Sequence, residues 1–473
     1  MLYPQLDSVL RAYSPSRFVL AFSGGMDSRV LLHLLARYQQ AHPEVTCQAV
    51  HVHHGLSANA DTWAAQCEAW AKEAGMACVV EHVTLPTGSG ESIEQLARDA
   101  RYQALNKHVD ANTVLLTAQH ADDQLETFLL ALKRGSGPAG LSAMPAQMAF
   151  GEGLHCRPLL GVSRTEIEQY AHAHQLEWVE DESNQDERYD RNFLRHQVTP
   201  LLTARWPGIR KAVARSASLC AEQERLLEDL LAAQLAQAVQ PDGSLAVTAL
   251  GSERQAKALI RLWLAQQDLV MPSQAQLQQM WDSVVNAKVD ANPQLCWHHY
   301  TLRRFQQRLY VVQPHASIDH VVLTCTVDTP CVLPSGLGTL CLQRLSVHPQ
   351  TVQPQNPKVQ DLELPASSVV GRLRLPHETE PVTIRFAAPA GVEVCPVGRV
   401  GKRKLKKLYQ EYGVPSWQRR RLPLIFYGDQ LVAVAGLFVV QAFAGEAYDD
   451  AGGGGSHVCD IVWSPRDQAC VDE

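Results

Sequence analysis

The sequence predicts an α/β domain built on a parallel sheet, followed by a mainly helical middle domain and a small α+β domain at the C-terminus. Three observations lead to this prediction. Apolar runs of strand length alternate with helix-length runs up to about residue 190, residues 213–280 are rich in Ala, Leu and Gln, and the part after residue 381 mixes short strands with a basic helix. Strands that alternate with helices favour a parallel sheet covered on both faces, whose ligands bind beyond the carboxyl ends of the strands.

The elements of the first domain follow from hydrophobic runs and their spacing. Residues 18–22 form an unbroken apolar run, which is typical of a strand buried on both faces of a parallel sheet. Between such runs, apolar residues three and four apart indicate amphipathic helices. The expected strands are 18–22, 46–52, 77–83 and 113–118, and the expected helices are 29–40, 60–75, 92–109 and 122–133.

The remaining elements are predicted in the same way. Residues 221–231 fit an amphipathic helix and 295–312 a short hairpin, while the Pro-, Gln- and Val-rich stretch 313–380 indicates a linker with short strands. Further on we expect strands at 381–387, 424–427 and 431–440, a basic helix at 402–412 that Gly413 ends, and a loop at 452–456. The expected domain bounds are 1–212 for the α/β domain, 213–315 for the mainly helical domain, 316–380 for the linker with short strands and 381–473 for the C-terminal α+β domain.

Length, termini and cysteines limit the class of protein. A chain of 473 residues exceeds what one hydrophobic core usually supports, so several domains are expected. The N-terminus lacks the basic and apolar regions of a secretory signal, and no run of about 18 apolar residues occurs, so we expect a cytoplasmic protein without a membrane partner. The twelve cysteines include no C-x-x-C pair, which argues against a zinc ribbon and a thioredoxin-type redox pair.

The charge is distributed unevenly along the chain. The net charge is −7, but residues 398–421 contain nine basic residues and one acidic residue, so this segment carries +8 and the rest carries −15. Such a segment predicts contacts with RNA phosphates, although a solvated basic face is the alternative. Trp417 either stacks on a base or packs in the core. The expected RNA-binding residues are Lys402, Arg403, Lys404, Lys406, Lys407 and Trp417.

A glycine-rich loop follows the first predicted strand and opens the first long helix. Adjacent glycines allow a tight turn and close approach of a ligand, and the free N–H groups of a helix N-terminus bind phosphate. No Lys stands where a Walker loop requires one, which excludes a kinase or GTPase P-loop. The alternative is a simple turn with Ser28 as the helix N-cap. The loop consists of Ser23, Gly24, Gly25, Met26, Asp27 and Ser28, and we expect it to bind the nucleotide.

This S-G-G-x-D-S loop resembles the signature of the PP-loop ATP pyrophosphatase superfamily. Further blocks resemble one of its members, the tRNA(Ile)-lysidine synthetase family. The blocks in the first domain are residues 50–57, 90–94, 100–102, 117–127, 132–141, 157–160, 180–184 and 191–195, and those in the last domain are 402–407 and 413–417. The resemblance covers nearly the whole chain and is weakest from 313 to 380.

The resemblance implies a two-step reaction. Members of the family use ATP to adenylate the C2 oxygen of the wobble cytidine of tRNA(Ile) with a CAU anticodon, with release of pyrophosphate. Free L-lysine then displaces AMP and forms lysidine. ATP is therefore the expected co-substrate and Mg²⁺ the expected metal, with Asp27 holding magnesium or pyrophosphate. The oligomeric state stays open, and a homodimer is one of the states considered.

Several charged residues fit the needs of this chemistry. Arg101 and Arg195 are candidates for stabilising the α-phosphate, and a surface ion pair is the alternative for each. Deprotonating the lysine ammonium at pH 7 costs about 4.6 kcal/mol, which a neighbouring carboxylate can offset. Asp123 and Glu126 lie three residues apart on one predicted helix face, so we expect them to bind lysine and act in catalysis.

Two histidines complete the predicted site. His120 precedes these carboxylates and is expected to orient the base or the phosphate, and the assignment of acid and base among the three side chains stays open. His53 ends the second predicted strand and is expected near the nucleotide, whereas a metal pair with His54 is the weaker alternative.

Three other functions compete with this interpretation. A tRNA thiolase of the same superfamily relays sulfur through reactive cysteines, commonly in a C-x-x-C pair, which this chain lacks. A glutamine-dependent synthetase carries a nucleophilic cysteine after Met1, where this chain has Leu2. A non-catalytic RNA-binding module needs neither the carboxylates nor Arg101.

Overall fold

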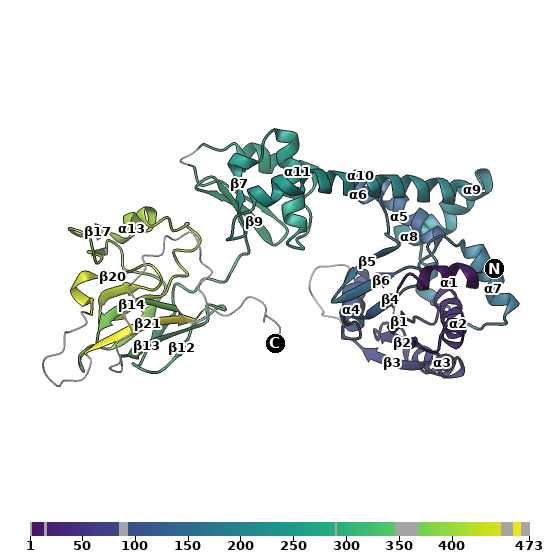
Figure 1. The fold of residues 1–473 in the computed structure, drawn as a ribbon, viewed down its shortest axis with the longest axis horizontal. Helices are drawn as coiled ribbons and strands as arrows, with labels where there is room; N and C mark the ends of the chain where they lie inside the picture. The colour runs from purple at the N-terminus through teal and green to yellow at the C-terminus, as the bar shows by residue number, and fades with distance from the viewer. Residues whose placement is uncertain are drawn as a thin grey trace. The chain divides into compact units, whose positions relative to one another are not determined.

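The computed structural model describes residues 2–13, 17–84, 93–288, 291–345, 368–445 and 457–464. Residues 90–92 of one family-like block and the predicted loop 452–456 lie outside these ranges. The chain divides into two compact units, Met1–Leu230 and Leu231–Glu473, which are described separately (Figure 1). No helix within the described ranges is both long and apolar enough to cross a bilayer.

The first unit contains a six-stranded sheet whose strand order is β3-β2-β1-β4-β6-β5. All neighbouring strands pair in parallel except β5, which is antiparallel to β6, so the predicted parallel sheet is confirmed. The hairpin of β5 and β6 was not predicted from the sequence. The strands are β1 (Arg17–Ala21), β2 (Thr46–His53), β3 (Ala77–His82), β4 (Thr113–Leu116), β5 (Gln147–Phe150) and β6 (Gly153–Cys156).

Helices cover both faces of this sheet. Phe18 and Leu20 of β1 belong to one apolar cluster and the intervening Val19 to another, which is why this strand is apolar throughout. The helices are α1 (Tyr3–Leu10), α2 (Met26–Ala41), α3 (Ala60–Glu73), α4 (Ile93–Asn106), α5 (Ala121–Lys133), α6 (Pro138–Leu141), α7 (Arg164–Ala173), α8 (Asp190–Phe193), α9 (Thr199–Arg205) and the long α10 (Ile209–Ala238), with a 3₁₀ turn at Glu182–Gln185 and a π-helical turn at Leu194–Val198.

The second unit begins with helices packed on a four-stranded antiparallel sheet of order β7-β10-β9-β8. Trp263 of the longest of these helices and Trp297 of the sheet are fully buried in their common core. The elements are β7 (Leu245–Ala246), a 3₁₀ turn at Val247–Ala249, α11 (Glu253–Ala265), α12 (Gln274–Gln279), a π-helical turn at Met280–Val285, β8 (Gln294–Trp297), β9 (Tyr300–Phe305) and β10 (Arg308–Val312). The predicted hairpin at 295–312 is confirmed as the three strands β8 to β10.

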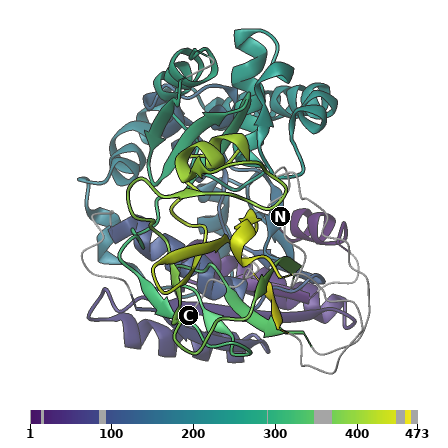
Figure 2. The ribbon, with the colours of Figure 1, turned by 90° about the vertical axis from the view of Figure 1, so that its left-hand side faces the viewer.

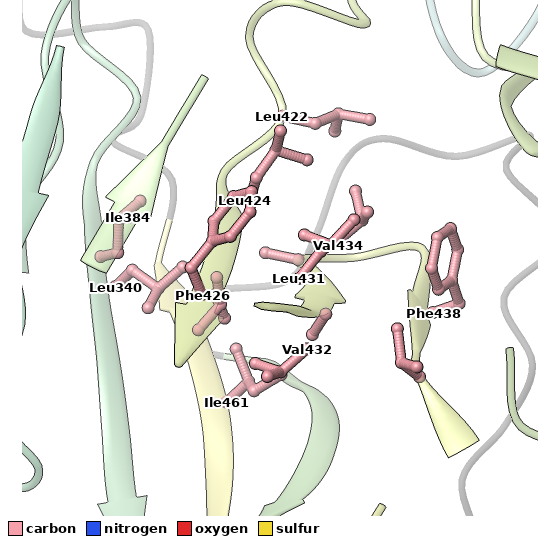
Figure 3. Packing of buried hydrophobic residues seen from close by; sticks show 14 of the residues in the cluster. Leu340, Ile384, Leu422, Leu424, Phe426, Leu431, Val432, Val434, Phe438 and Ile461 are labelled. Atoms are coloured by element: carbon pink, nitrogen blue, oxygen red, sulfur yellow. The ribbon is translucent and has the colours of Figure 1, made fainter. Parts of the chain in front are cut away.

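Two further antiparallel sheets form the C-terminal part, which Figures 1 and 2 show from two sides. Strands from 322–374, which the sequence analysis assigned to the linker range, pair with strands that come after residue 381. Leu340 and Ile461 of one sheet lie near Ile384, Leu424 and Phe426 of the other in a common core (Figure 3). One sheet contains β11 (Val322–Thr324), β15 (Val382–Arg385), β18 (Leu424–Tyr427), β19 (Gln430–Val434) and β20 (Phe438–Val439), and the other contains β12 (Cys331–Val332), β13 (Thr339–Arg344), β21 (Val458–Ser464) and β14 (Ser368–Arg374).

The basic helix is shorter than predicted. Helix α13 (Leu405–Glu411) begins at Leu405 rather than at residue 402, because the two residues before it form β17 (Arg403–Lys404) and pair with β16 (Glu393–Val394). Gly413 ends the helix as expected. It adopts φ +68°, and the N–H of the following Val414 returns to the carbonyl of Tyr409 at 2.8 Å.

Candidate active site

The glycine-rich loop leaves β1 and becomes the first turn of α2. Gly24 has φ +83°, and a Cβ there would lie 2.8 Å from Cys67 Sγ and 2.9 Å from Val179 Cγ2, so only glycine fits. Gly25 is the N-cap of α2 and has no side chain to accept from the first turn. The helix therefore begins with N–H groups that its own cap does not occupy, as a phosphate site requires.

The serines of the loop hold its shape. Ser28 lies in the first turn and donates from Oγ to the Gly25 carbonyl at 2.9 Å, so the alternative in which Ser28 is the N-cap is wrong. Its Oγ also lies 3.0 Å from Ser23 Oγ, which joins the two ends of the loop. Met26 is buried in the core below.

Asp27 of this loop faces His120, which is the N-cap of α5. Asp27 Oδ2 lies 3.6 Å from His120 Nε2, and the Asp122 N–H donates to His120 Nδ1 at 3.2 Å. That backbone bond leaves the proton of a neutral imidazole on Nε2. The side chain of His120 is 1% exposed, and neither His120 Nε2 nor Asp27 Oδ1 has a hydrogen-bond partner among the residues that the structure describes. Two buried polar atoms without partners thus lie at the exit of the loop.

Asp27 and His120 each shift the pKa of the other. Burial alone would raise the pKa of Asp27, but the close contact and charge of His120, with the charges of Arg164 and Arg195, lower it below its usual range. Burial alone would lower the pKa of His120, but the contact with Asp27 and the charges of Asp123, Asp27 and Asp122 raise it. The site therefore favours an ionised Asp27 and a proton on His120 Nε2.

Asp123 and Glu126 lie together on α5, as predicted, and Arg195 bridges them. Arg195 Nη2 lies 3.1 Å from Asp123 Oδ1, and its Nε lies 2.9 Å from Glu126 Oε1. Arg191 Nε donates to Glu126 Oε2 at 3.0 Å. Glu126 is 1% exposed, so two guanidinium groups satisfy both oxygens of a fully buried carboxylate. The π-helical turn at Leu194–Val198 carries Arg195 into this position.

Two arginines of the site were not predicted. Arg191 belongs to a family-like block but was not singled out, and its spacing of four residues from Arg195 was the available signal. Arg164 begins α7, and its Nη1 lies 3.8 Å from Asp27 Oδ2. Asp122 holds this helix start in place because its Oδ2 accepts from the Arg164 N–H at 2.9 Å and its Oδ1 pairs with Arg210 Nε at 2.6 Å. Nothing in the local sequence marks Arg164.

His53 ends β2, the strand beside β1, and Arg101 of α4 contacts His54, the residue that follows it. Arg101 Nε donates to His54 Nε2 at 3.3 Å, and burial together with this arginine lowers the pKa of His54 to about 4. His53 Nε2 lies 2.9 Å from Asp61 Oδ1. None of the contacts found in the described ranges joins Arg101 or His53 to Asp27 or His120. The same ranges contain no group of three or more His, Cys, Asp or Glu side chains placed to hold a metal ion.

The basic segment of the second unit presents free charge. Lys402, Arg403, Lys404, Lys406 and Lys407 are all exposed, and none forms an ion pair with a described residue. The apolar side of α13 is buried through Leu405, Leu408 and Tyr409, which turns the lysines of this helix to solvent.

Trp417 lies close to the β9–β10 hairpin. Its ring centroid is 5.5 Å from that of Tyr310 and 6.1 Å from that of Phe305, and the Arg303 guanidinium lies 5.4 Å from it. These contacts favour packing over base stacking for Trp417.

Comparison with known proteins places this site in a family. A PP-loop domain matches residues 2–202, a TilS substrate binding domain residues 244–310, and a TilS substrate C-terminal domain residues 382–452. Among solved structures, the U34-tRNA thiolase NcsA from Methanococcus maripaludis aligns with a TM-score of 0.42 at 16% identity, over 47% of this chain and 78% of that one. A likeness at that level identifies no activity.

Full-length relatives are much closer. The tRNA(Ile)-lysidine synthase of Photobacterium profundum is 58% identical over 451 residues, which is 95% of this chain and 98% of that protein. The enzyme of the same name from Vibrio parahaemolyticus is 48% identical over 98% of both chains. These matches do not favour the thiolase alternative. The chain, with its PP-loop, its buried carboxylates and its basic C-terminal segment, belongs to the tRNA(Ile)-lysidine synthase family.

Proposed function

We propose that this chain uses ATP to adenylate the C2 oxygen of the wobble cytidine in CAU-anticodon tRNA(Ile), and then joins free L-lysine to C2. The first step forms a bond between that oxygen and the α-phosphorus of ATP and releases pyrophosphate. In the second step the lysine ε-amine attacks C2, AMP leaves with the oxygen, and a base takes the amine proton. The observation that supports this most directly is that two buried atoms, Asp27 Oδ1 and His120 Nε2, have no hydrogen-bond partner among the described residues and lie beside an uncapped helix N-terminus. We place the reaction in the cytoplasm, where tRNA and ATP meet.

The PP-loop side of the site suits the adenylation step. The N–H groups at the start of α2 and Ser23 bind the phosphates, while Arg195 and Arg164 stabilise the charge that develops on the α-phosphate. Mg²⁺ in nucleotide sites is usually held by one or two carboxylates plus phosphate oxygens, and Asp27 Oδ1, buried without a partner, fits this pattern. When bound, the ion neutralises phosphate charge. Asp27 is thus the residue that would hold it.

The two carboxylates on α5, Asp123 and Glu126, have different roles in the second step. Glu126 has both oxygens occupied by Arg191 and Arg195, so it orients these guanidinium groups toward the nucleotide. Asp123 is more accessible, because its side chain is 13% exposed against 1% for Glu126, although its Oδ2 accepts from the His120 N–H at 3.0 Å and its Oδ1 meets Arg195. We assign to Asp123 the attraction of the lysine ammonium and the removal of its proton, and to His120 the orientation of the base or phosphate through Nε2–H.

The unpaired cations of the second unit suit the RNA backbone. Five exposed basic side chains within six residues, Lys402 to Lys407, neutralise phosphates without first breaking ion pairs of their own. Trp417 supports this surface by packing rather than by contact with a base.

Transfer of labelled lysine tests the proposal. The purified chain is incubated with a tRNA(Ile) transcript bearing CAU, ATP and radiolabelled lysine, and the same transcript with a GAU anticodon is the control. We expect label in the CAU transcript alone, with one AMP and one pyrophosphate released per lysine. Absence of label in the presence of ATP would contradict the proposal, and incorporation of sulfur from a sulfur donor instead would identify a thiolase.

A further inference from the structure

A line of buried polar side chains runs from Arg157, just after β6, toward the end of β4. Arg157 is 6% exposed, and no carboxylate among the described residues pairs with it. Its Nη1 donates to the Pro145 carbonyl at 2.8 Å, and its Nη2 lies 3.3 Å from His155 Nδ1. A guanidinium can only donate, so His155 Nδ1 must accept and must carry no proton.

The direction of each following bond is then determined. Burial and the charge of Arg157 lower the pKa of His155 to about 3, so the ring is neutral and its proton is on Nε2. His155 Nε2 lies 2.7 Å from Thr117 Oγ1 and donates to it. Thr117 directs its own hydroxyl proton to Gln119 Oε1. Both His155 and Thr117 are buried, so water does not compete for these bonds.

The directions of these hydrogen bonds fix the orientation of the Gln119 side-chain amide. Its oxygen is occupied by Thr117, which leaves the two N–H donors of Nε2, and no described residue accepts from them. Gln119 is half-buried, precedes His120 and follows β4 at the carboxyl end of the sheet, where the PP-loop also lies. Two oriented donors at this edge suit an acceptor oxygen of a ligand.

We propose that Gln119 Nε2 donates a hydrogen bond to an oxygen of the reacting substrates, either a nucleotide phosphate oxygen or the carbonyl oxygen of the nucleobase, and that Thr117, His155 and Arg157 are positioning residues that hold the amide in this orientation. This inference deepens the proposed function and rests on it. It assigns a role to residues at β4 and β6 that neither the PP-loop nor the α5 carboxylates require.

Substitutions that preserve side-chain shape test this chain of hydrogen bonds, which runs from Arg157 through His155 and Thr117 to Gln119. Gln119→Met removes the donors at similar length and without charge, and we expect kcat/KM for lysine transfer to fall about 100-fold, as for loss of one preorganised donor. Thr117→Val removes the hydroxyl that links His155 to Gln119 but keeps the shape of the side chain, and we expect kcat/KM for lysine transfer to fall about 10-fold. Thr117→Ser restores the hydroxyl and should recover activity to within about 3-fold of the unsubstituted chain.

Thr113→Val is the matched control. Thr113 is a buried threonine on the same strand whose Oγ1 donates to Asp110 Oδ1 at 2.7 Å at the opposite end of β4. It should lose stability like Thr117→Val but keep kcat/KM. Equal activity of the two valine variants, or full activity of Gln119→Met, would overturn the inference.

Binding measurements separate the two oxygen sources. Affinity for a non-hydrolysable ATP analogue is measured without RNA, in the unsubstituted chain and in Gln119→Met. Weaker binding identifies the phosphate oxygen, whereas unchanged binding with slower adenylation of tRNA identifies the base oxygen. If the unsubstituted chain transfers no lysine, the proposed function fails. The inference itself is then judged on pyrophosphate release and is overturned if Gln119→Met leaves both nucleotide binding and that release unchanged.

Discussion

The two units of this chain present charge in opposite ways. In the first unit, Asp27, His120, Glu126 and Arg195 are wholly or largely buried, and each meets a partner of opposite charge. In the second unit, the basic residues from Lys402 to Lys407 are exposed and meet no described acidic partner. Buried pairing fixes positions, as chemistry on one atom requires, whereas exposed unpaired charge attracts a polyanion without fixing it. The contrast predicts that substitutions in the first unit will reduce catalysis and stability, whereas substitutions of the basic residues in the second unit will reduce RNA binding.

The largest effect is expected at Asp27. Asp27→Ala removes the carboxylate that faces both His120 and the phosphate site, and we expect ATP-dependent pyrophosphate release to fall by about 1000-fold. Binding of tRNA should be retained, because we assign the main RNA contacts to the basic residues Lys402 to Lys407 of the other unit. Release at the unsubstituted rate, with normal RNA modification, would contradict the site assignment.

Glu126 should affect stability as well as activity. Glu126→Ala removes the fully buried carboxylate that Arg191 and Arg195 share and leaves them Asp123 alone, so we expect a loss of about 3 kcal/mol of unfolding free energy, the lower end for breaking a buried pair. Chemical denaturation measures this loss. Asp190→Asn, which removes an equivalent charge from the exposed Lys133–Asp190 pair, is the control and should change little. Equal effects of the two substitutions would show that the α5 network is not a buried one.

Neutralising the exposed cations should weaken RNA binding alone. For the triple substitution of Lys404, Lys406 and Lys407 to Gln, we expect tRNA affinity to fall about 10-fold near physiological salt and the slope of log affinity against log salt to drop by up to about 3. Pyrophosphate release from bound substrates should persist. Arg420→Gln is the control, because Arg420 is already paired with Asp319 at 2.5 Å. An unchanged slope would exclude α13 from the RNA contact.

The smallest expected effect is the pH dependence of the unfolding free energy that His120 and Asp27 cause. The pKa of His120 is raised in the fold, so its protonation stabilises the native state below about pH 6.5, and this contribution is lost as pH rises through the folded value. The pKa of Asp27 is lowered, so its ionisation stabilises above about pH 3.8 and is lost as pH falls. His120→Asn keeps a cap acceptor and removes the titration. The decline in unfolding free energy above pH 6.5 should therefore flatten in this variant, and an identical profile would contradict the raised pKa.

Much of the fold could be predicted because local patterns determine it. The unbroken apolar run at 18–22 marks a strand buried on both faces, and Gly24 marks a turn that only glycine can make. The start of the basic helix could not be predicted, because Arg403 and Lys404 pair with a strand ten residues earlier, and a charged run shows no sign of that partner. Short strands were expected within 316–380, but their partners could not be predicted, because β11, β13 and β14 pair with strands distant in sequence.

The sequence by itself determined the PP-loop, its place between a strand and a helix, the spacing of Asp123 and Glu126, and the charge of the C-terminal segment. Only the tertiary structure decided which charges meet. It brought Arg164 to Asp27, Arg191 and Arg195 to Glu126, and His155 to Thr117. The physical reason is that these pairs join residues far apart along the chain, and their energies depend on burial and direction, which no local run of residues encodes.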